Sequence, residues 1–195
     1  MKQMWDKRYT GEDYFYGIQP NNFFKDKIND FKPGKILLPA EGEGRKSVYA
    51  AGLGWDVSAF DYSTEARGKA LRLSKENNVQ IDYSISSLED ADYEKESFDM
   101  LVLIYAHSKD RQNIHRRLLT FLKPGGVIVL EAFSKKQRGN DSGGPKDINM
   151  LFSIEELKND FSQLRELDVR EEEIVLAEGD HHSGKASVIR LLGRK

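Results

Sequence analysis

The sequence of 195 residues contains no cysteine. This absence excludes disulfide bonds, thiolate metal sites and cysteine nucleophiles. An excess of charge of either sign is also missing, because 30 basic residues face 32 acidic ones and the net charge is −2. Proteins that bind nucleic acid through its phosphates need a basic surface, so we expect no nucleic-acid partner. A small-molecule partner fits this charge balance better.

Long apolar runs are missing as well. No stretch approaches the roughly 18 apolar residues that a membrane-spanning helix requires. The charged, aromatic start of the chain lacks the apolar segment of a signal peptide, so we expect a cytoplasmic protein with no membrane partner. The length predicts one domain over residues 1–195, with an N-terminal aromatic arm or lid over 1–19 and a core over 20–195. No pattern in the sequence sets the oligomeric state.

The core alternates apolar runs with helical patterns. Predicted strands cover residues 36–38, 57–60, 79–85, 98–105, 127–133, 164–177 and 186–192. Among the first five, helical patterns follow the first, second and fourth, and a polar acidic loop over 86–97 follows the third. This alternation indicates a parallel sheet with right-handed crossovers. The last two have no helix between them and must pair antiparallel. The predicted fold class is α/β, a Rossmann-like, seven-stranded and mostly parallel sheet with an antiparallel C-terminal hairpin and helices on both faces.

Several of the predicted helices begin with a capping residue. Ser63 and Asp110 each precede a helical pattern, where a short polar side chain can bond a free backbone amide. Ser153 and Glu156 have the spacing of a capping box, in which each side chain bonds the other's backbone amide. These residues predict where three of the helices start.

The stretch from Lys35 to Ser63 carries the clearest binding signal. An apolar run leads to Gly42 and Gly44, where a ligand can approach the backbone, and the free amides of the next helix suit a carboxylate or phosphate. Asp61 follows about 20 residues later at a strand end, where a carboxylate can accept hydrogen bonds from both hydroxyls of a ribose. The stretch predicts a nucleoside-containing ligand. The alternative is that Asp61 caps the following helix.

Taken together, the strand–helix units, the Gly-x-Gly turn, the acid after the second strand, Lys-Pro-Gly-Gly before the fifth and the terminal hairpin resemble class I S-adenosylmethionine-dependent methyltransferases. Further motifs are similar to the branch of tellurite-resistance and thiopurine-type methyltransferases. These are Trp5-Asp6-Lys7-Arg8-Tyr9, Tyr16-Gly17, Pro20-Asn21, Gly42-Glu43-Gly44-Arg45 and Gly143-Gly144-Pro145. The resemblance implies S-adenosyl-L-methionine as the cofactor. It implies a small-molecule methyl acceptor, for which a thiol, a chalcogen oxyanion or a heterocycle is expected.

The resemblance also implies a set of cofactor-binding residues. Gly42 and Gly44 would face the methionyl part of the cofactor, in a turn that also contains Ala40 and Glu41, and Asp61 would bind the ribose hydroxyls.

The adenine and the transferred methyl would lie over the neighbouring strand ends. Tyr62 would flank the adenine, and Ser87 and Leu88 would meet its edge. Ile104 and Tyr105, at the end of the fourth strand, would lie under the cofactor near the transferred methyl.

Two departures from the family pattern bear on affinity. Leu38 stands where many relatives carry an acid before the glycine turn, and Ala40 replaces the first glycine of that turn. Glu41 is a candidate for the missing acid. Ser87 replaces the adenine-contacting acid and offers a hydroxyl without charge.

Catalytic candidates are His107 and Tyr16. His107 follows the fourth strand, where it can orient or deprotonate an acceptor, or serve only as a satisfied polar residue. His115 lies beside two arginines and is expected to be solvated. His181 and His182 belong to the hairpin turn, either as turn residues or reaching over the pocket. No metal site is predicted, and a soft chalcogen acceptor needs no general base.

Two other functions are considered. Gly42-x-Gly44-x-x-Ser47 is close to the dinucleotide fingerprint, which suggests an NAD(P)-dependent dehydrogenase, although its third glycine and a substrate domain are missing. The other alternative is a non-catalytic cofactor-binding protein of the same fold, which Leu38 and Ser87 suggest. Hydrolase and nucleoside-triphosphatase functions are disfavoured, because neither a Gly-x-Ser-x-Gly elbow nor a phosphate-binding Gly-x-x-x-x-Gly-Lys-[Ser/Thr] loop occurs.

Overall fold

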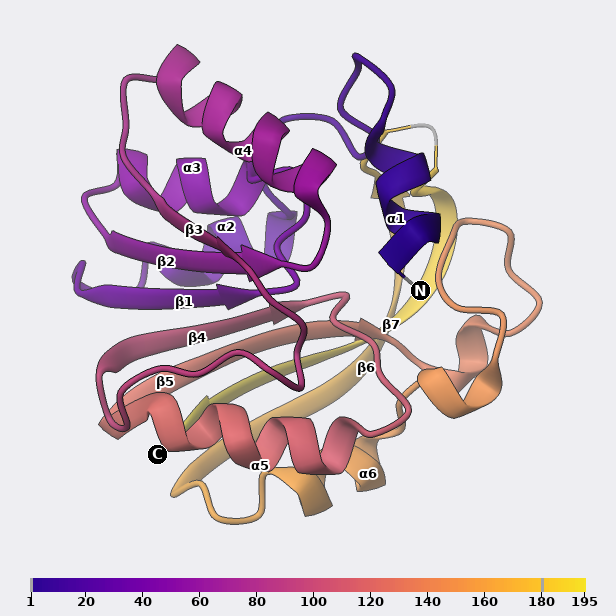
Figure 1. Cartoon of the computed structure of the whole chain (residues 1–195). Coiled ribbons are helices and arrows are strands. Elements are labelled where there is room, and N and C mark those ends of the chain that lie inside the picture. The colour runs from indigo at the N-terminus through magenta and orange to yellow at the C-terminus, as the bar shows by residue number, and fades with distance from the viewer. Residues whose placement is uncertain (1, 180) are drawn as a thin grey trace.

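Seven strands form one sheet in the computed structural model, which describes residues 2–179 and 181–195. The strands are β1 (Lys35–Pro39), β2 (Asp56–Asp61), β3 (Asp82–Ile85), β4 (Phe98–Ile104), β5 (Leu122–Phe133), β6 (Glu166–Ala177) and β7 (Ser183–Arg194). Their order is β3-β2-β1-β4-β5-β7-β6. Strands β1 to β5 are parallel, and β7 runs antiparallel to both β5 and β6. The predicted fold class is confirmed (Figure 1).

Helices cover both faces of the sheet (Figure 1). They are α1 (Lys2–Tyr9), α2 (Asn22–Ile28), α3 (Arg45–Gly52), α4 (Thr64–Glu76), α5 (Arg111–Phe121) and α6 (Ile154–Asp160). Two short 3₁₀ helices, Lys135–Gln137 and Ile148–Met150, follow β5. Among the described residues, no helix has the length and apolarity needed to cross a membrane.

The two faces of the sheet form two separate cores, because successive side chains of a strand point in opposite directions. Ile36 and Leu38 of β1 pack with the face covered by α2, α3 and α4, whereas Leu37 packs with the face covered by α5 and α6. Burial on both faces explains why the central parallel strands are continuous apolar runs.

Two of the three predicted helix caps form as expected. The Ser63 hydroxyl accepts the amide of Ala66 at 3.2 Å, and Ser153 and Glu156 form the complete capping box. Asp110 stands at the N-cap of α5, but its carboxylate accepts from the side chain of Asn113 and makes no capping bond. The start of α5 was therefore predicted correctly, but the predicted capping bond from the Asp110 side chain does not form.

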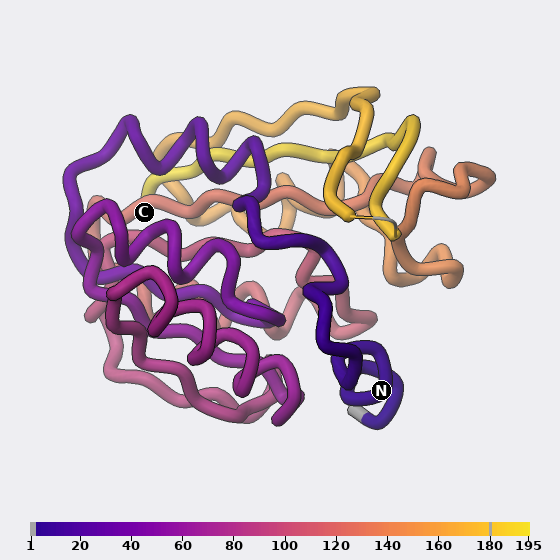
Figure 2. Tube along the Cα trace, turned by 90° about the horizontal axis from the view of Figure 1, so that it is seen from above, coloured from indigo at the N-terminus to yellow at the C-terminus, as the bar shows by residue number. Residues whose placement is uncertain are grey.

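Residues 2–9 of the arm form helix α1. Its helical pattern is weak, and its contacts are to distant parts of the chain: the hydroxyl of Ser63 donates to Asp6 at 2.6 Å. Figure 2 shows the arm passing between the amino ends of α3 and α4 on one side and the β6–β7 turn on the other. The arm thus follows the carboxyl edge of the parallel strands.

The strand order changes direction between β1 and β4, which are neighbours although β2 and β3 separate them in sequence. Ligands of open α/β sheets bind at such a reversal, outside the carboxyl ends of the strands. The glycine turn follows β1, Asp61 ends β2, and Tyr105 follows β4. The fold therefore gathers the predicted site residues at one edge.

Candidate functional site

The glycine turn after β1 has an alternating left-handed backbone. Ala40, Gly42 and Gly44 have φ values of 50°, 68° and 87°. A Cβ on Gly44 would lie 2.5 Å from the Cβ of Ala70, so the turn packs directly on α4. Ala40 adopts the same left-handed backbone conformation although it has a Cβ. This conformation costs roughly 1–2 kcal/mol for a non-glycine residue. The turn has thus lost one glycine and kept its shape.

Asp61 ties the end of β2 to this turn. One carboxylate oxygen accepts the amide of Gly42 at 3.1 Å, and the other accepts the amide of Ser63 at 2.9 Å. The side chain is buried, and burial raises the pKa of this carboxyl to about 6, although the two amide bonds act in the opposite direction. Because the Ser63 hydroxyl caps α4, Asp61 is not needed as the cap.

Glu41 serves the amino end of α3. Its Oε1 accepts the amides of Lys46 and Ser47 at 3.0 and 2.8 Å, and its Oε2 pairs with the Lys46 ammonium at 2.8 Å. The expectation of free amides at this helix start was therefore wrong, since a carboxylate of the chain itself occupies them. Leu38 is fully buried in the core, so position 38 offers no acid.

The arm docks on the glycine turn and on α4. The Tyr9 hydroxyl lies 3.1 Å from the point where a Cβ of Gly42 would be. The amide of Phe15 donates to the Glu43 carboxylate at 2.8 Å, and Lys69 of α4 donates to the same carboxylate at 2.7 Å. Residue 42 must therefore be small where the arm crosses it.

The predicted adenine-side residues lie beside Asp61. The amide of Ser86 donates to the carbonyl of Asp61 at 3.1 Å, which brings the loop containing Ser87 and Leu88 to the end of β2. The Ser87 hydroxyl donates to Asp90 at 2.7 Å. Tyr62 is half-buried next to Asp61, and burial raises the pKa of its phenol.

The two residues at the end of β4 differ in role. Ile104 is buried in the core. Tyr105 has a φ of 56°, a rare backbone conformation for a bulky residue, and its hydroxyl donates to Glu131 at 2.7 Å. Its side chain therefore belongs to a polar network on the β5 side of the site.

Both ring nitrogens of His107 bond the backbone. Nδ1 lies 2.6 Å from the Met150 carbonyl, and the amide of Phe133 donates to Nε2 at 3.2 Å. These partners require a neutral ring with its proton on Nδ1. Burial lowers the pKa of His107 to about 4. The arrangement favours a structural role over the predicted catalytic one.

His115 is buried, and the expectation that it is solvated was wrong. Its Nδ1 lies 2.9 Å from the carboxylate of Asp160, and its ring stacks on Phe161. Both partners come from α6 and the residue that follows it. The pair joins α5 to α6, away from the glycine turn.

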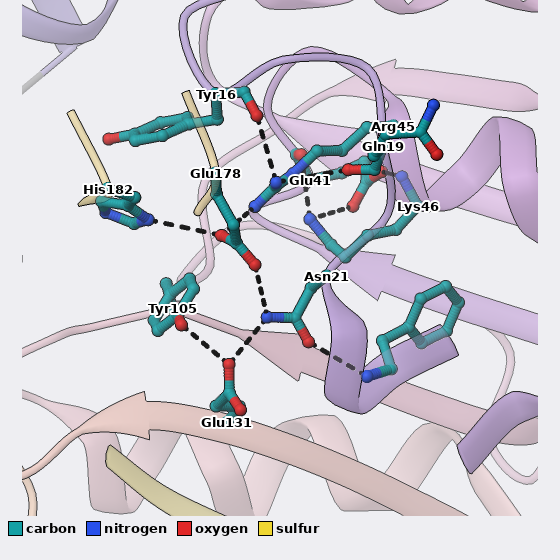
Figure 3. A network of polar contacts seen from close by, with 11 residues as sticks. Tyr16, Gln19, Asn21, Glu41, Arg45, Lys46, Tyr105, Glu131, Glu178 and His182 are labelled. Atoms are coloured by element: carbon teal, nitrogen blue, oxygen red, sulfur yellow. Dashed lines mark hydrogen bonds and ion pairs between the residues drawn. The ribbon is translucent and has the colours of Figure 1, made fainter. Parts of the chain in front are cut away.

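A buried polar network that the sequence did not predict lies on the β5 side of the site (Figure 3). One side-chain nitrogen of Asn21 donates to Glu131 at 2.7 Å and to Glu178 at 2.8 Å. The oxygen of the same amide caps α2 by accepting the amide of Phe24. Glu131 is fully buried in β5, so the available signal was an acid within the otherwise apolar run VIVLEAF.

Arg45 connects this network to the glycine turn and to the arm. Its guanidinium donates to Glu178 at 2.7 Å and to the carbonyls of Tyr16 and Gln19 at 3.2 and 3.3 Å. Arg45 is the first residue of α3 and is buried. One side chain therefore joins the turn after β1, the arm and the C-terminal hairpin.

The residues present fit the adenosine part of the expected cofactor. A buried carboxylate stands at the tip of β2, fixed by the amide of Gly42 in the left-handed glycine turn. The fit is poorer for the methionyl amino group, because Leu38 is apolar and the carboxylate of Glu41 is already paired.

Comparison with known proteins identifies a methyltransferase domain over residues 36–126. A tRNA (uracil(54)-C(5))-methyltransferase of Pyrococcus abyssi is 27% identical over 80% of this chain and 40% of its own length. A ubiquinone biosynthesis O-methyltransferase of Xanthomonas campestris is 32% identical over 54% of this chain and 48% of its own length. The chain thus spans less than half of the length of these curated relatives.

Solved structures share the fold over the whole chain. A structure from work on the conversion of a disulfide bond into a thioacetal group during echinomycin biosynthesis has a TM-score of 0.75 at 18% identity and is covered over 93% of its length. TehB of Haemophilus influenzae has a TM-score of 0.71 at 18% identity, with 66% of it covered. Residues 36–126 therefore match a methyltransferase domain, and the chain as a whole has the fold of these solved structures.

Proposed function

We propose that this protein transfers the methyl group of S-adenosylmethionine to a small-molecule acceptor. The observation that supports this most directly is Asp61, a buried carboxylate fixed at the tip of β2 by the amide of Gly42. In this position it can accept hydrogen bonds from the two ribose hydroxyls of the cofactor. The cofactor supplies a methyl group already activated by the positive charge on its sulfur.

The chain's own groups have mainly to position the reactants and exclude water. The arm covers the glycine turn through Tyr9 and bonds α4 through Asp13, whose carbonyl accepts from Lys69 at 2.6 Å. Arg45 holds the arm and the hairpin together over the same edge. A covered site of this kind favours methyl transfer by aligning donor and acceptor and by keeping out water.

A small acceptor is favoured over a nucleic acid. One relative is named as a tRNA methyltransferase, but this chain has a net charge of −2 and no surplus of basic residues for a phosphate backbone. The arm also contacts the hairpin turn at this edge, where the ring of Phe15 stacks on that of His181 at 3.7 Å.

Isothermal titration with S-adenosylmethionine and S-adenosylhomocysteine tests the cofactor assignment. We expect both to bind, and Asp61→Ala to weaken binding by about tenfold or more, since it removes the acceptor of two hydrogen bonds. Asp56→Ala is the matched control, because Asp56 is exposed at the other end of the same strand. Absence of binding to the wild type would contradict the proposal.

The same titration with NADH tests the dehydrogenase alternative, which the methyltransferase domain match does not support. The non-catalytic alternative is tested by offering thiol, selenite, tellurite and heterocyclic acceptors to protein loaded with S-adenosylmethionine. We expect S-adenosylhomocysteine to form with at least one acceptor class. Tight cofactor binding without product across the panel would favour the non-catalytic function.

A further inference from the structure

The hairpin turn brings a histidine into an aromatic cluster at the carboxyl ends of β4 and β5. His182 is 6% exposed. Its ring lies 4.4 Å from that of Tyr16, 5.0 Å from that of Tyr105 and 5.4 Å from that of Phe133. These three residues come from the arm, from the end of β4 and from the end of β5. His182 therefore stands on the side of the site where the acceptor is expected.

One ring nitrogen of His182 faces a carboxylate and the other does not. Nδ1 lies 3.5 Å from the Glu178 carboxylate (Figure 3). Within residues 2–179 and 181–195, Nε2 has no hydrogen-bond partner, in contrast to His107, whose two nitrogens both bond the backbone. This is the arrangement of an imidazole whose outer nitrogen can take up a proton while a carboxylate orients the ring.

The carboxylate behind His182 is itself firmly held. Glu178 accepts from Arg45 at 2.7 Å and from Asn21 at 2.8 Å. Burial by itself raises the pKa of Glu178, but the hydrogen bonds and charges of His182, Arg45 and Asn21 outweigh burial and lower it to about 2. Glu178 is therefore ionised at neutral pH and can stabilise a positive charge on the imidazole.

The loop after β5 is shaped around this histidine. A Cβ on Gly143 would lie 2.6 Å from Cδ2 and 3.1 Å from Nε2 of His182, and φ at Gly143 is 123°. A larger residue there would press on the imidazole edge. Glycine at position 143 thus allows the loop to approach the imidazole edge closely.

We propose that His182, oriented by Glu178, removes the proton of the methyl acceptor. This inference rests on the proposed methyl transfer. The bond between the acceptor atom and its proton breaks, and that electron pair forms the bond to the methyl carbon. The bond between sulfur and the methyl carbon breaks with its pair left on sulfur, and the proton goes to Nε2. The resulting imidazolium faces the Glu178 carboxylate.

Nitrogen NMR of the His182 ring tests the pair without any turnover. In the proposed pair the neutral ring carries its proton on Nδ1, which faces Glu178, and leaves Nε2 unprotonated. We expect Glu178→Leu to reduce the fraction of this tautomer, because the variant removes the acceptor that faces Nδ1. An unchanged tautomer would overturn the orientation by Glu178.

Two thiols serve as probe acceptors. Phenylmethanethiol is protonated at neutral pH and needs a base, whereas 4-nitrothiophenol is already ionised. His182→Gln is expected to slow methylation of the first by about 100-fold, the usual scale of general-base catalysis, and to leave the second nearly unchanged. His181→Gln, which alters the neighbouring ring stacked on Phe15, should affect neither.

The outcomes separate this proposal from the proposed function. Equal losses with both thiols would show that His182 has only a structural role, and no loss with either would show that it is not the base. A wild type that binds S-adenosylhomocysteine but methylates neither thiol would also overturn the assignment. A wild type that binds no S-adenosylhomocysteine would instead contradict the proposed function itself. Binding by His182→Gln within about twofold of wild type, as expected for a residue outside the cofactor contacts, keeps the two apart.

Discussion

The Asp61 carboxylate accepts the backbone amide of Gly42 at 3.1 Å. This bond joins the tip of β2 to the glycine turn, so the proposed ribose acceptor and the turn proposed to face the cofactor are positioned together. It also means that the charge on Asp61 is buried, with consequences for the pH dependence of binding.

Affinity for S-adenosylhomocysteine should fall on mild acidification. Burial raises the pKa of Asp61 to about 6, so the carboxyl is ionised at pH 7 and mostly protonated at pH 5. Only the ionised form accepts freely from both ribose hydroxyls, so affinity should drop about tenfold between these pH values. Isothermal titration at both pH values measures the change. Asp61→Asn should bind weakly with a flat profile, and equal wild-type affinity at pH 5 and 7 would contradict the interpretation.

Ala40→Gly should stabilise the protein. Ala40 has a φ of 50°, a conformation that is strained for alanine and not for glycine. Relief of this strain should outweigh the larger conformational entropy that glycine loses on folding. We therefore expect the unfolding free energy to rise by about 0.5–1 kcal/mol. Urea denaturation gives the unfolding free energy. Ala51→Gly is the control, because Ala51 lies within α3 and glycine there should cost about 1 kcal/mol. Destabilisation by both variants would argue against strain at residue 40.

His107 should make the fold sensitive to acid. Burial lowers the pKa of His107 to about 4 in the folded chain. Between pH 6.5 and 4 the histidine is therefore protonated in the unfolded chain but neutral in the folded chain. Stability contributed by the neutral ring is thus lost as pH falls from 6.5 to 4, by roughly 3 kcal/mol. Asp61 acts in the opposite direction over part of this range, because its folded pKa is raised. The difference in unfolding free energy between wild type and His107→Gln at each pH isolates the histidine, and a constant difference would contradict the prediction.

Arg45→Met should release the arm. The variant removes the donor to the carbonyls of Tyr16 and Gln19 and leaves the buried Glu178 without its ion-pair partner. Hydrogen exchange of residues 10–20 should therefore accelerate by about tenfold or more. Arg72→Met is the matched control, because Arg72 also bonds the arm but is exposed. Similar acceleration in both variants would show that no single contact holds the arm.

The strands of the sheet and their parallel or antiparallel direction were predictable because their signals are local. Apolar runs such as residues 98–105 and the alternation with helical patterns depend on neighbours in sequence, and so did the caps at Ser63 and Ser153. The glycine turn and Asp61 were found in the same way, since both stand at strand ends. The proposed cofactor side of the site thus consists largely of residues in one stretch of the sequence.

The acceptor side was not visible, because its partners are far apart in sequence. A network of Glu131, Asn21 and Glu178 forms only when β5, the start of α2 and the hairpin meet. His115 was mistaken for a solvated residue for the same reason, since its partner Asp160 lies on another helix. Polar residues of this kind have no period, and only the folded chain gives them partners.

The bond from Asn21 to Glu178 spans 157 positions of the chain. Contacts between residues so far apart in sequence close large loops, which costs conformational entropy. They form late, after the local strand–helix units have brought the distant segments together. Asn21 follows the arm and precedes the whole sheet in sequence, whereas Glu178 follows β6. We therefore expect the sheet to assemble before the arm docks, so that the site is completed only at the end of folding.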